Sequence, residues 1–246
     1  MSEYVGVDWS TDGWLAVAFD ATGFDHAAVF GEIGELWQRY EEVAERILVD
    51  VPIGLIERGG DGRECDELAR RVLGPRRRSV FTPPVREATR KRRYPAAKRV
   101  NERKAGLSLS KQAFAISDGI AEVDDLLRNV PEARMAFVES HPEVCFRAFA
   151  GEPLQYSKRT AAGYAERMRT LASFDTDAPP VVQQVAEATG GEEVTVDDVL
   201  DAVALAYTAT PGPGTVRSLP PEPPVDAKGL PMRIVYRSER PLLVDE

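Results

Sequence analysis

Residues 5–19, VGVDWSTDGWLAVAF, contain two apolar runs that are joined by a short polar turn with a glycine. Runs rich in β-branched and aromatic residues and bounded by Gly or Asp are typical of β-strands. A third run, FDHAAVF at 24–30, follows after another short glycine-containing turn. Together the runs predict an antiparallel three-stranded meander that starts near residue 3, and its first strand ends on a carboxylate, Asp8.

Two later apolar runs also end on a carboxylate. The segment RILVDVPIGL at 46–55 reaches Asp50, and RMAFVESHPE at 134–143 reaches Glu139. The first of these is continuously apolar at 47–49, as expected for a strand that is covered on both faces. Because an isolated carboxylate is costly to bury, three strands that each end on an acid indicate that these acids share one site.

Much of the remaining chain has apolar residues at helical spacing. This spacing predicts helices at 32–46, 62–74, 108–130, 142–151, 159–174 and 195–210. Gly74 fits a helix C-terminus, and Ser108 or Ser110 and Thr195 fit N-caps. A stretch at 211–231 holds seven prolines and predicts an ordered surface loop, and 232–239 predicts a closing edge strand.

Three antiparallel strands, a helix, and then strands that return through helical crossovers give the element order of the ribonuclease H fold. The sequence therefore predicts an α/β protein with a mixed five-stranded sheet, in which three antiparallel strands are followed by parallel ones, flanked by helices. We expect a single domain over residues 1–246, with helical insertions, a basic insertion at about 75–104 and the proline-rich loop at about 211–231.

In this fold the fourth and fifth strands run parallel to the central first strand, so their carboxyl ends meet at one edge of the sheet. We therefore expect Asp8, Asp50 and Glu139 to converge. Asp198 and Asp201 lie three residues apart in the last predicted helix and share one of its faces. Like charges this close raise one another's pKa, and a divalent ion relieves the repulsion. The five acids predict a two-metal site for Mg²⁺ or Mn²⁺, which prefer carboxylate oxygens.

The basic insertion, PRRRSVFTPPVREATRKRRYPAAKRVNERK, holds twelve Lys or Arg and two Glu, so the rest of the chain carries a charge of −19. Such a block is either a solvated loop or an arm that contacts an anionic ligand. The contrast between this basic segment and the acidic remainder of the chain favours the second interpretation, with nucleic acid as the partner. Phe81 and Tyr94 could stack on its bases. The predicted phosphate-contacting residues are Arg76, Arg77, Arg78, Arg90, Arg92 and Arg93.

The whole chain has a net charge of −9 and 25 Arg against 6 Lys. An acidic, lysine-poor surface fits adaptation to high salt, and a GC-rich genome would also favour Arg. The global charge argues against a simple nucleic-acid binder. The sequence has neither an apolar run of membrane-spanning length nor a secretory leader, and Cys65 and Cys145 lack metal-site spacing, so we expect a reduced, cytoplasmic protein.

Five segments together resemble an uncharacterised family catalogued as domain of unknown function 429, described as predicted RNase H-like nucleases. They are VGVDWSTDGWLAVAF, DVPIGL, RRRSVFTPP, ESHPEVCFRAFAG followed by SK, and DDVLDAVALA, and they span nearly the whole chain. The last segment also resembles a helix of Holliday-junction resolvases. The resemblance implies metal-dependent phosphodiester hydrolysis, with Asp8, Asp50 and Asp201 as ligands and Glu139 and Asp198 as helpers.

Two other functions fit parts of the sequence. An actin-like or sugar-kinase-like ATP-dependent phosphotransferase shares this core and a similar first turn, but it usually needs two such lobes and further glycine-rich phosphate loops. A non-catalytic nucleic-acid-binding module fits the basic insertion. The carboxylates argue against that module, because a pure binder has no use for acids beside phosphates.

Four of the acids also have structural interpretations. Asp8 could bond backbone N–H groups in its D-x-S turn, and Asp50 could be an ordinary strand-end carboxylate. Asp198 could serve the positive end of its helix dipole. Asp201 lies in an otherwise apolar helix, which argues against a solvated helix face.

The other polar candidates are less specific. Glu143 lies four residues after Glu139 and could replace it as the fourth carboxylate. His141 precedes a proline, which favours a hydrogen-bonded turn or core histidine over a catalyst. We interpret His26 as a surface residue, and Lys158 as a solvated lysine with phosphate contact as the alternative.

Overall fold

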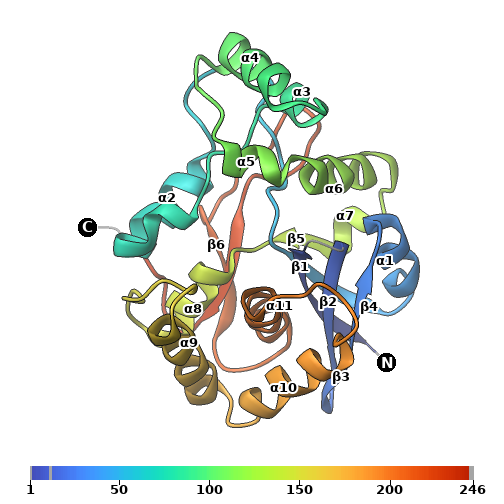
Figure 1. The fold of residues 1–246 in the computed structure, drawn as a ribbon, viewed down its shortest axis with the longest axis vertical. Coiled ribbons are helices and arrows are strands. Elements are labelled where there is room, and N and C mark those ends of the chain that lie inside the picture. The colour runs from blue at the N-terminus through green and yellow to red at the C-terminus, as the bar shows by residue number, and fades with distance from the viewer. Residues whose placement is uncertain (1, 11–12, 244–246) are drawn as a thin grey trace.

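A mixed five-stranded sheet lies at the centre of the structure, a computed structural model that describes residues 2–10 and 13–243 (Figure 1). Its strand order is β3-β2-β1-β4-β5. The strands are β1 (Glu3–Ser10), β2 (Gly13–Asp20), β3 (Gly23–Phe30), β4 (Ala44–Val49) and β5 (Phe137–Glu139). The first three pair antiparallel, and β4 and β5 continue the sheet parallel to β1. This order confirms the predicted fold class and is consistent with a ribonuclease H-like fold.

The carboxyl ends of β1, β4 and β5 lie in register. Val7 pairs with Val49, and Val49 pairs with Glu139. The amide of Asp50 donates to the Val7 carbonyl at 3.0 Å, which extends the pairing to the last residue of this edge. Asp8, Asp50 and Glu139 therefore reach the same edge of the sheet, as the sequence predicts.

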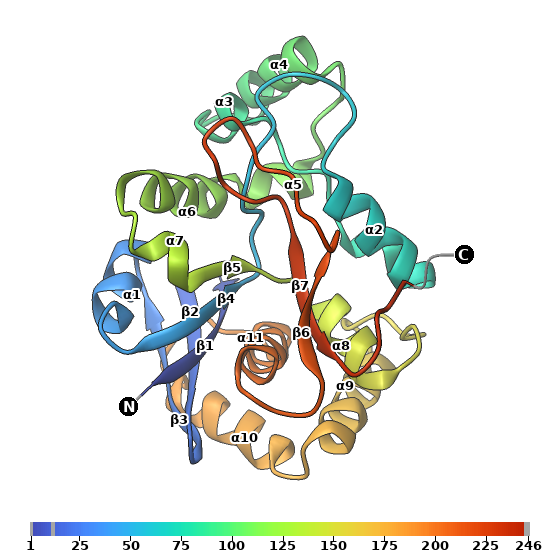
Figure 2. The same ribbon diagram turned by 180° about the vertical axis from the view of Figure 1, so that it is seen from behind.

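Helices cover both faces of the sheet (Figures 1 and 2). One face packs against α11, and α8, α9 and α10 surround that helix; the other face packs against α1, α6 and α7. Alternate residues of β2 point to the two cores, which explains why this strand is apolar throughout. The bounds are α1 (Ile33–Tyr40), α6 (Ser117–Asn129), α7 (Ala133–Ala136), α8 (Pro142–Ala150), α9 (Ala161–Phe174), α10 (Ala178–Ala188) and α11 (Val196–Ala209).

A glycine in β1 sets the distance between the sheet and α11. A Cβ at Gly6 would overlap the backbone carbonyl of Ala202 and the backbone amide of Ala206. Only a residue without a side chain allows this approach. Asp201, the neighbour of Ala202, is thereby carried close to the end of β1.

The long connection from β4 to β5 extends beyond the carboxyl end of the sheet, at the top of Figure 1. Its helices before α6 are α2 (Glu64–Leu73), the 3₁₀ helix η1 (Gly74–Ser79), α3 (Arg86–Thr89), α4 (Tyr94–Ala105) and α5 (Lys111–Ala115). The predicted basic insertion thus consists of η1, α3, α4 and the turns between them. These elements stand next to the sheet edge that carries the three strand-end acids.

A second, two-stranded sheet is formed by β6 (Thr215–Leu219) and β7 (Ile234–Ser238). The predicted closing strand is confirmed, but its partner β6 lies inside the proline-rich stretch that the sequence assigns to a loop. The hydroxyl of Ser140 donates to the Val235 carbonyl at 2.7 Å and joins β7 to the end of β5. The prolines therefore flank a strand rather than fill one loop.

Three predicted elements have different boundaries in the structure. The helix predicted at 32–46 ends at Tyr40, because residues from Ala44 pair with β1 as β4 and strand pairing outweighs the helical pattern. The helix predicted at 108–130 is broken at Ile116 into α5 and α6, which pack in separate apolar clusters. The strand predicted at 133–140 is shortened, since its first four residues form α7.

The predicted Ser110 and Thr195 caps are present, since each side chain accepts a hydrogen bond from its own helix. Cys65 and Cys145 are buried free thiols. Over residues 2–10 and 13–243, no helix has the length and hydrophobicity that crossing a membrane requires.

Candidate functional site

Three of the predicted acids meet at the carboxyl edge of the sheet. Asp8 lies two residues before the end of β1, Asp50 directly follows β4, and Asp201 lies in α11. Asp8 is 7% exposed and Asp201 is 2% exposed. Burial raises the pKa of Asp8 well above its usual value, and the charges of Asp50 and Asp201 raise it further. The three carboxylates therefore form one electrostatically coupled group, which we call the acidic cluster.

The other two members of the acidic cluster are also hard to ionise. Burial, with the charges of Asp50 and Glu143, raises the pKa of Asp201 to about 7, although Lys158 opposes the rise. Burial and the charge of Glu143 raise the pKa of Asp50, and His141 and Lys158 oppose that rise. A positive charge placed among these carboxylates would lower all three pKa values.

Lys158 supplies one such charge from the loop between α8 and α9. Its ammonium group forms an ion pair with Oδ2 of Asp201. Burial lowers the pKa of Lys158, but the carboxylates of Asp201, Asp8 and Asp50 outweigh burial, and the pKa lies above its usual value. Lys158 is thus bound to the acidic cluster, which corrects its interpretation as a solvated lysine.

Several acceptor atoms of this site have no donor. Oδ1 of Asp201 and Oε2 of Glu143 are buried and lack a hydrogen-bond partner among the described residues. Within the same part of the chain, the carboxylates of Asp8 and Asp50 also accept no hydrogen bond. Since buried polar atoms are nearly always paired, these oxygens are available to a ligand that carries positive charge.

Glu143 is the glutamate that faces the acidic cluster. It lies in the first turn of α8 and is 4% exposed. Its Oε1 accepts hydrogen bonds from Nε of the buried Arg167, at 3.0 Å, and from Nη2, at 2.5 Å. Its other oxygen is the unpartnered one, and its charge raises the pKa of both Asp50 and Asp201.

Glu139, which the sequence analysis places among the catalytic acids, has a different environment. Both carboxylate oxygens accept from Arg63, Oε2 from Nη1 at 2.8 Å and Oε1 from Nη2 at 2.6 Å, and Oε2 also accepts from the Ile53 amide at 2.7 Å. The same guanidinium pairs with Asp66 and donates to the Ile53 and Gly54 carbonyls. Glu139 lines the cleft, but these contacts tie it to the loop that follows Asp50.

Asp198 has a structural contact as well. Its Oδ2 accepts from the Thr195 amide at 2.8 Å, and the Thr195 hydroxyl accepts from the Asp198 amide at 3.3 Å. These two bonds form a capping box at the start of α11. Asp198 also lines the cleft, and its charge contributes to the raised pKa of Asp8.

The acidic cluster opens into a cleft made of two hollows. One, of about 320 Å³, contains Asp8 and Asp50 beside the apolar side chains of Trp9 and Phe81. The other, of about 570 Å³, contains Asp201 and Glu143. The two hollows adjoin one another, because both are lined by Asp50, Ser79, Phe81, His141, Lys158 and Arg159.

The predicted phosphate-contacting arginines are divided by the structure. Arg76 and Arg78 of η1 line the cleft, and Nε of Arg76 is buried without a partner among the described residues. Arg77, Arg92 and Arg93 are exposed outside its lining. Arg90 lies elsewhere and is ion-paired with Asp124 and Asp125, each at 2.6 Å. Two of the six predicted arginines, Arg76 and Arg78, therefore line the cleft that contains the acidic cluster.

Other residues near the cleft differ from expectation in smaller ways. Phe81 lines the cleft as a stacking residue would, whereas Tyr94 packs edge-on against Phe114 inside the insertion. His141 caps α8: its Nδ1 accepts from the Glu143 amide at 3.2 Å, and its Nε2 contacts the Ser79 carbonyl at 3.4 Å. It is the hydrogen-bonded turn histidine that the sequence favours.

Two cleft residues were not predicted as functional. Arg159 adjoins Lys158 and lines both hollows, and Glu143 was only an alternative to Glu139. The SK segment of the family pattern is a sequence signal for Lys158 but not for Arg159, and loop residues have no periodicity that predicts where they point.

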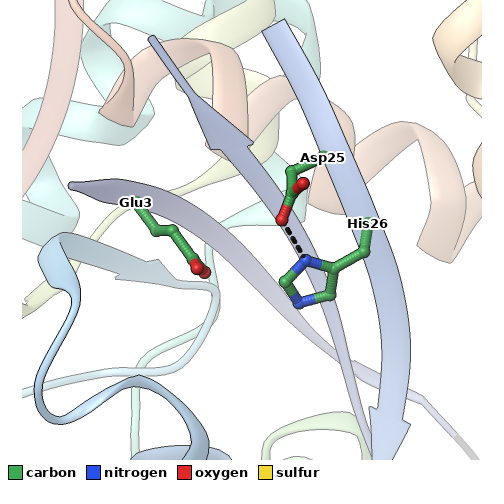
Figure 3. Close-up of side chains that lie close together, drawn as sticks. All are labelled: Glu3, Asp25 and His26. Carbon is green, nitrogen blue, oxygen red and sulfur yellow. Dashed lines mark hydrogen bonds and ion pairs between the residues drawn. The ribbon is translucent and has the colours of Figure 1, made fainter. Parts of the chain in front are cut away.

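A second group of ligand atoms lies at the amino end of β1, away from the cleft (Figure 3). The potential ligand atoms of Glu3, Asp25 and His26 all lie within 4.8 Å of one another, and no other such group of His, Cys, Asp or Glu occurs among the described residues. This group could hold a metal ion. His26 Nδ1 pairs with Asp25 at 2.7 Å and Nε2 contacts the Tyr40 hydroxyl at 2.9 Å, so His26 is half-buried and engaged rather than a free surface residue.

The carboxylate oxygens of Asp8, Asp50 and Asp201 do not all lie within 4.8 Å of one another, so an ion bound by all three would draw them closer together.

The comparisons with known proteins add one finding. Neither a curated protein nor a solved structure matches the chain significantly. Residues 6–225 match a family described as "Protein of unknown function (DUF429)". Since the match covers β1 to β6 and every residue of the acidic cluster, the chain belongs to the DUF429 family.

Proposed function

We propose that this protein is a divalent-metal-dependent hydrolase that cleaves phosphodiester bonds in nucleic acid. The observation that carries the proposal is the convergence of Asp8, Asp50 and Asp201 from two parallel strands and one helix, beside a cleft lined by arginines. Carboxylates repel a phosphate that is bound by these arginines unless a cation lies between the two groups.

The chemistry of the donor atoms fits Mg²⁺ or Mn²⁺, and binding would bring the carboxylates closer together than they lie without an ion. All three side chains offer carboxylate oxygens, which are the ligands that these hard ions prefer. Oδ1 of Asp201 is buried without a partner among the residues described, and Asp8 and Asp50 accept no hydrogen bond from them. The ligands would be Asp8, Asp50 and Asp201. When bound, the ion supplies an activated water and neutralises charge on the phosphate.

The protein's own residues provide the remaining functions. The charges of Asp50 and Asp201 both act on Asp8, so Asp8 would help to hold an ion bound by either of them. Arg76, Arg78 and Arg159 line the cleft and would position the phosphates of the substrate. Trp9 and Phe81 offer ring surfaces beside Asp8 on which a base could stack.

The two other functions have less support. An ATP-dependent kinase of this fold usually has two lobes, whereas the described residues form one five-stranded sheet and one two-stranded sheet. A non-catalytic module would not need buried acids with raised pKa values, because they lower its affinity for phosphate and its stability.

Cleavage assays on labelled substrates test the proposal. Single-stranded and duplex DNA, single-stranded RNA and a four-way junction are incubated with Mn²⁺, with Mg²⁺ or with a chelator. We expect cleavage of at least one substrate that requires the metal, is lost in Asp8→Asn and is retained in Glu42→Gln, which removes an exposed acid far from the cleft. Absence of metal-dependent cleavage, or equal cleavage by both variants, would contradict it.

A further inference from the structure

Lys158 is a cation that lies among the carboxylates of the acidic cluster. Its ammonium group pairs with Oδ2 of Asp201, and the charges of Asp8 and Asp50 also act on it. Lys158 also lines both hollows of the cleft. Because Lys158 holds Oδ2 of Asp201, only Oδ1 of this buried acid, which has no partner among the described residues, can bind a metal ion.

We infer that Lys158 is a built-in cation that takes the second of two cation positions, so that the acidic cluster binds one divalent ion instead of two. The inference rests on the proposed function, since it concerns the same site. It replaces a two-metal arrangement with one ion at Asp8, Asp50 and Oδ1 of Asp201, and with the Lys158 ammonium at Oδ2.

The charges of the site support one ion. Asp8, Asp50 and Asp201 together with Lys158 leave two negative charges, which a single divalent ion neutralises. Glu143 does not change this balance, because it is paired with the buried Arg167. A second divalent ion would leave two uncompensated positive charges in a buried site, which is costly.

The loop that carries Lys158 is ordered by specific contacts. The Thr160 hydroxyl donates to the Ser157 carbonyl at 2.8 Å, and the Thr160 amide donates to the same carbonyl at 3.0 Å. A Cβ at Gly163 would overlap that carbonyl, so α9 can approach the loop only because position 163 is glycine. Arg167 also donates to the Tyr156 carbonyl at 3.2 Å. The backbone that carries Lys158 is therefore held on both sides.

The ammonium group retains donors for a substrate. Of its three N–H groups, one donates to Asp201, and the described residues supply no acceptor for the others. The side chain is 34% exposed and lines the cleft. Lys158 is thus placed to donate to a phosphate oxygen of a substrate in the cleft.

Calorimetric titration of the full chain with Mn²⁺, at fixed ionic strength, measures the number of ions, and every protein is titrated in a His26→Ala background so that an ion at Glu3, Asp25 and His26 is not counted. We expect one ion per chain for the wild type and for Lys158→Arg, which keeps the positive charge. Lys158→Met should bind two ions, the first at least tenfold more tightly than the wild type, because a nearby positive charge is removed. The control, Lys98→Met, removes a lysine that pairs with Glu102 on the surface of α4 and should bind one ion.

The wild type and Lys158→Arg keep the test decisive even if Lys158→Met does not fold. Two ions in the wild type would overturn the inference, because Lys158 would then be displaced or irrelevant. One ion in both the wild type and Lys158→Met would overturn it as well. If the wild type shows no saturable Mn²⁺ binding, the result would instead contradict the proposed metal-dependent function itself.

Discussion

The carboxylate of Glu139 and the guanidinium of Arg63 form a buried ion pair with two hydrogen bonds, at 2.6 and 2.8 Å. Both side chains are almost completely buried. Arg63 also holds the carbonyls of Ile53 and Gly54, so the pair connects the end of β5 to the loop after Asp50. Glu139 is therefore tied to this loop by its hydrogen bonds, whereas the charge of Glu143 acts directly on Asp50 and Asp201.

Substitutions in this pair should lower stability in a graded way. Arg63→Met leaves Glu139 and Asp66 buried without a cation and should lower the free energy of unfolding by about 3–5 kcal/mol. Glu139→Gln should lower it by about 1–3 kcal/mol, because Asp66 still compensates Arg63 and one charged hydrogen bond is weakened. Urea denaturation with and without Mn²⁺ measures both changes. If Glu139→Gln instead abolishes Mn²⁺ binding without loss of stability, Glu139 is a ligand.

Asp201→Asn should separate metal binding from folding. Asparagine keeps the volume of the side chain but removes the charge that a divalent ion needs at Oδ1. We expect Mn²⁺ affinity to fall at least tenfold and cleavage to be lost, while the metal-free protein binds nucleic acid as tightly as the wild type or more tightly. Filter-binding and calorimetric titrations check these results. An Asp201→Asn variant that binds Mn²⁺ and cleaves like the wild type would remove Asp201 from the site.

The stability of the metal-free protein should depend on Asp201 in a defined pH window. Asp201 has its pKa raised from 3.8 to about 7 in the folded state, so between these values the folded protein binds more protons than the unfolded chain. Its contribution is complete below pH 4 and is lost as the pH rises through about 7.

Asp201→Asn should therefore match the wild type near pH 4 and exceed its free energy of unfolding by about 1–3 kcal/mol at pH 8. Denaturation curves of both proteins in chelator at several pH values measure the difference. A variant that is less stable than the wild type at pH 8 would mean that the Lys158–Asp201 ion pair outweighs the burial of the carboxylate.

The arginines of the basic insertion should fall into two classes. Arg76→Ala with Arg78→Ala should weaken nucleic-acid binding and reduce the slope of log affinity against log salt by about 1–2, since fewer counterions are released. Arg90→Ala should leave this slope nearly unchanged and lower stability, because Arg90 is paired with Asp124 and Asp125. Binding measured at several salt concentrations distinguishes them. The opposite pattern would move the phosphate contacts to α3 and α4.

The sheet and the positions of Asp8 and Asp50 could be predicted because strand patterns are local. An alternating or continuous pattern of apolar residues over six to eight positions shows where a strand begins and ends. Parallel pairing then brings the carboxyl ends of the strands together. Asp201 was predictable because a charged residue inside an apolar helix is costly without a partner. The Gly6 contact that sets its distance from β1 was not visible in the sequence.

The roles of Glu139, Lys158 and Arg90 could not be predicted, because each depends on a partner far away in the chain. Arg63 lies 76 residues before Glu139, and Lys158 lies 43 residues before Asp201. Such pairs leave no periodic pattern in either segment. Similarly, residues 44–46 have a helical pattern, but pairing with β1 makes them a strand.

Anomalous diffraction from crystals grown in Mn²⁺ locates the ion without reference to activity. We expect an anomalous peak bounded by the carboxylates of Asp8, Asp50 and Asp201, with Oδ1 of Asp201 as a ligand. An empty acidic cluster, or a peak only at Glu3, Asp25 and His26, would contradict the proposed metal site.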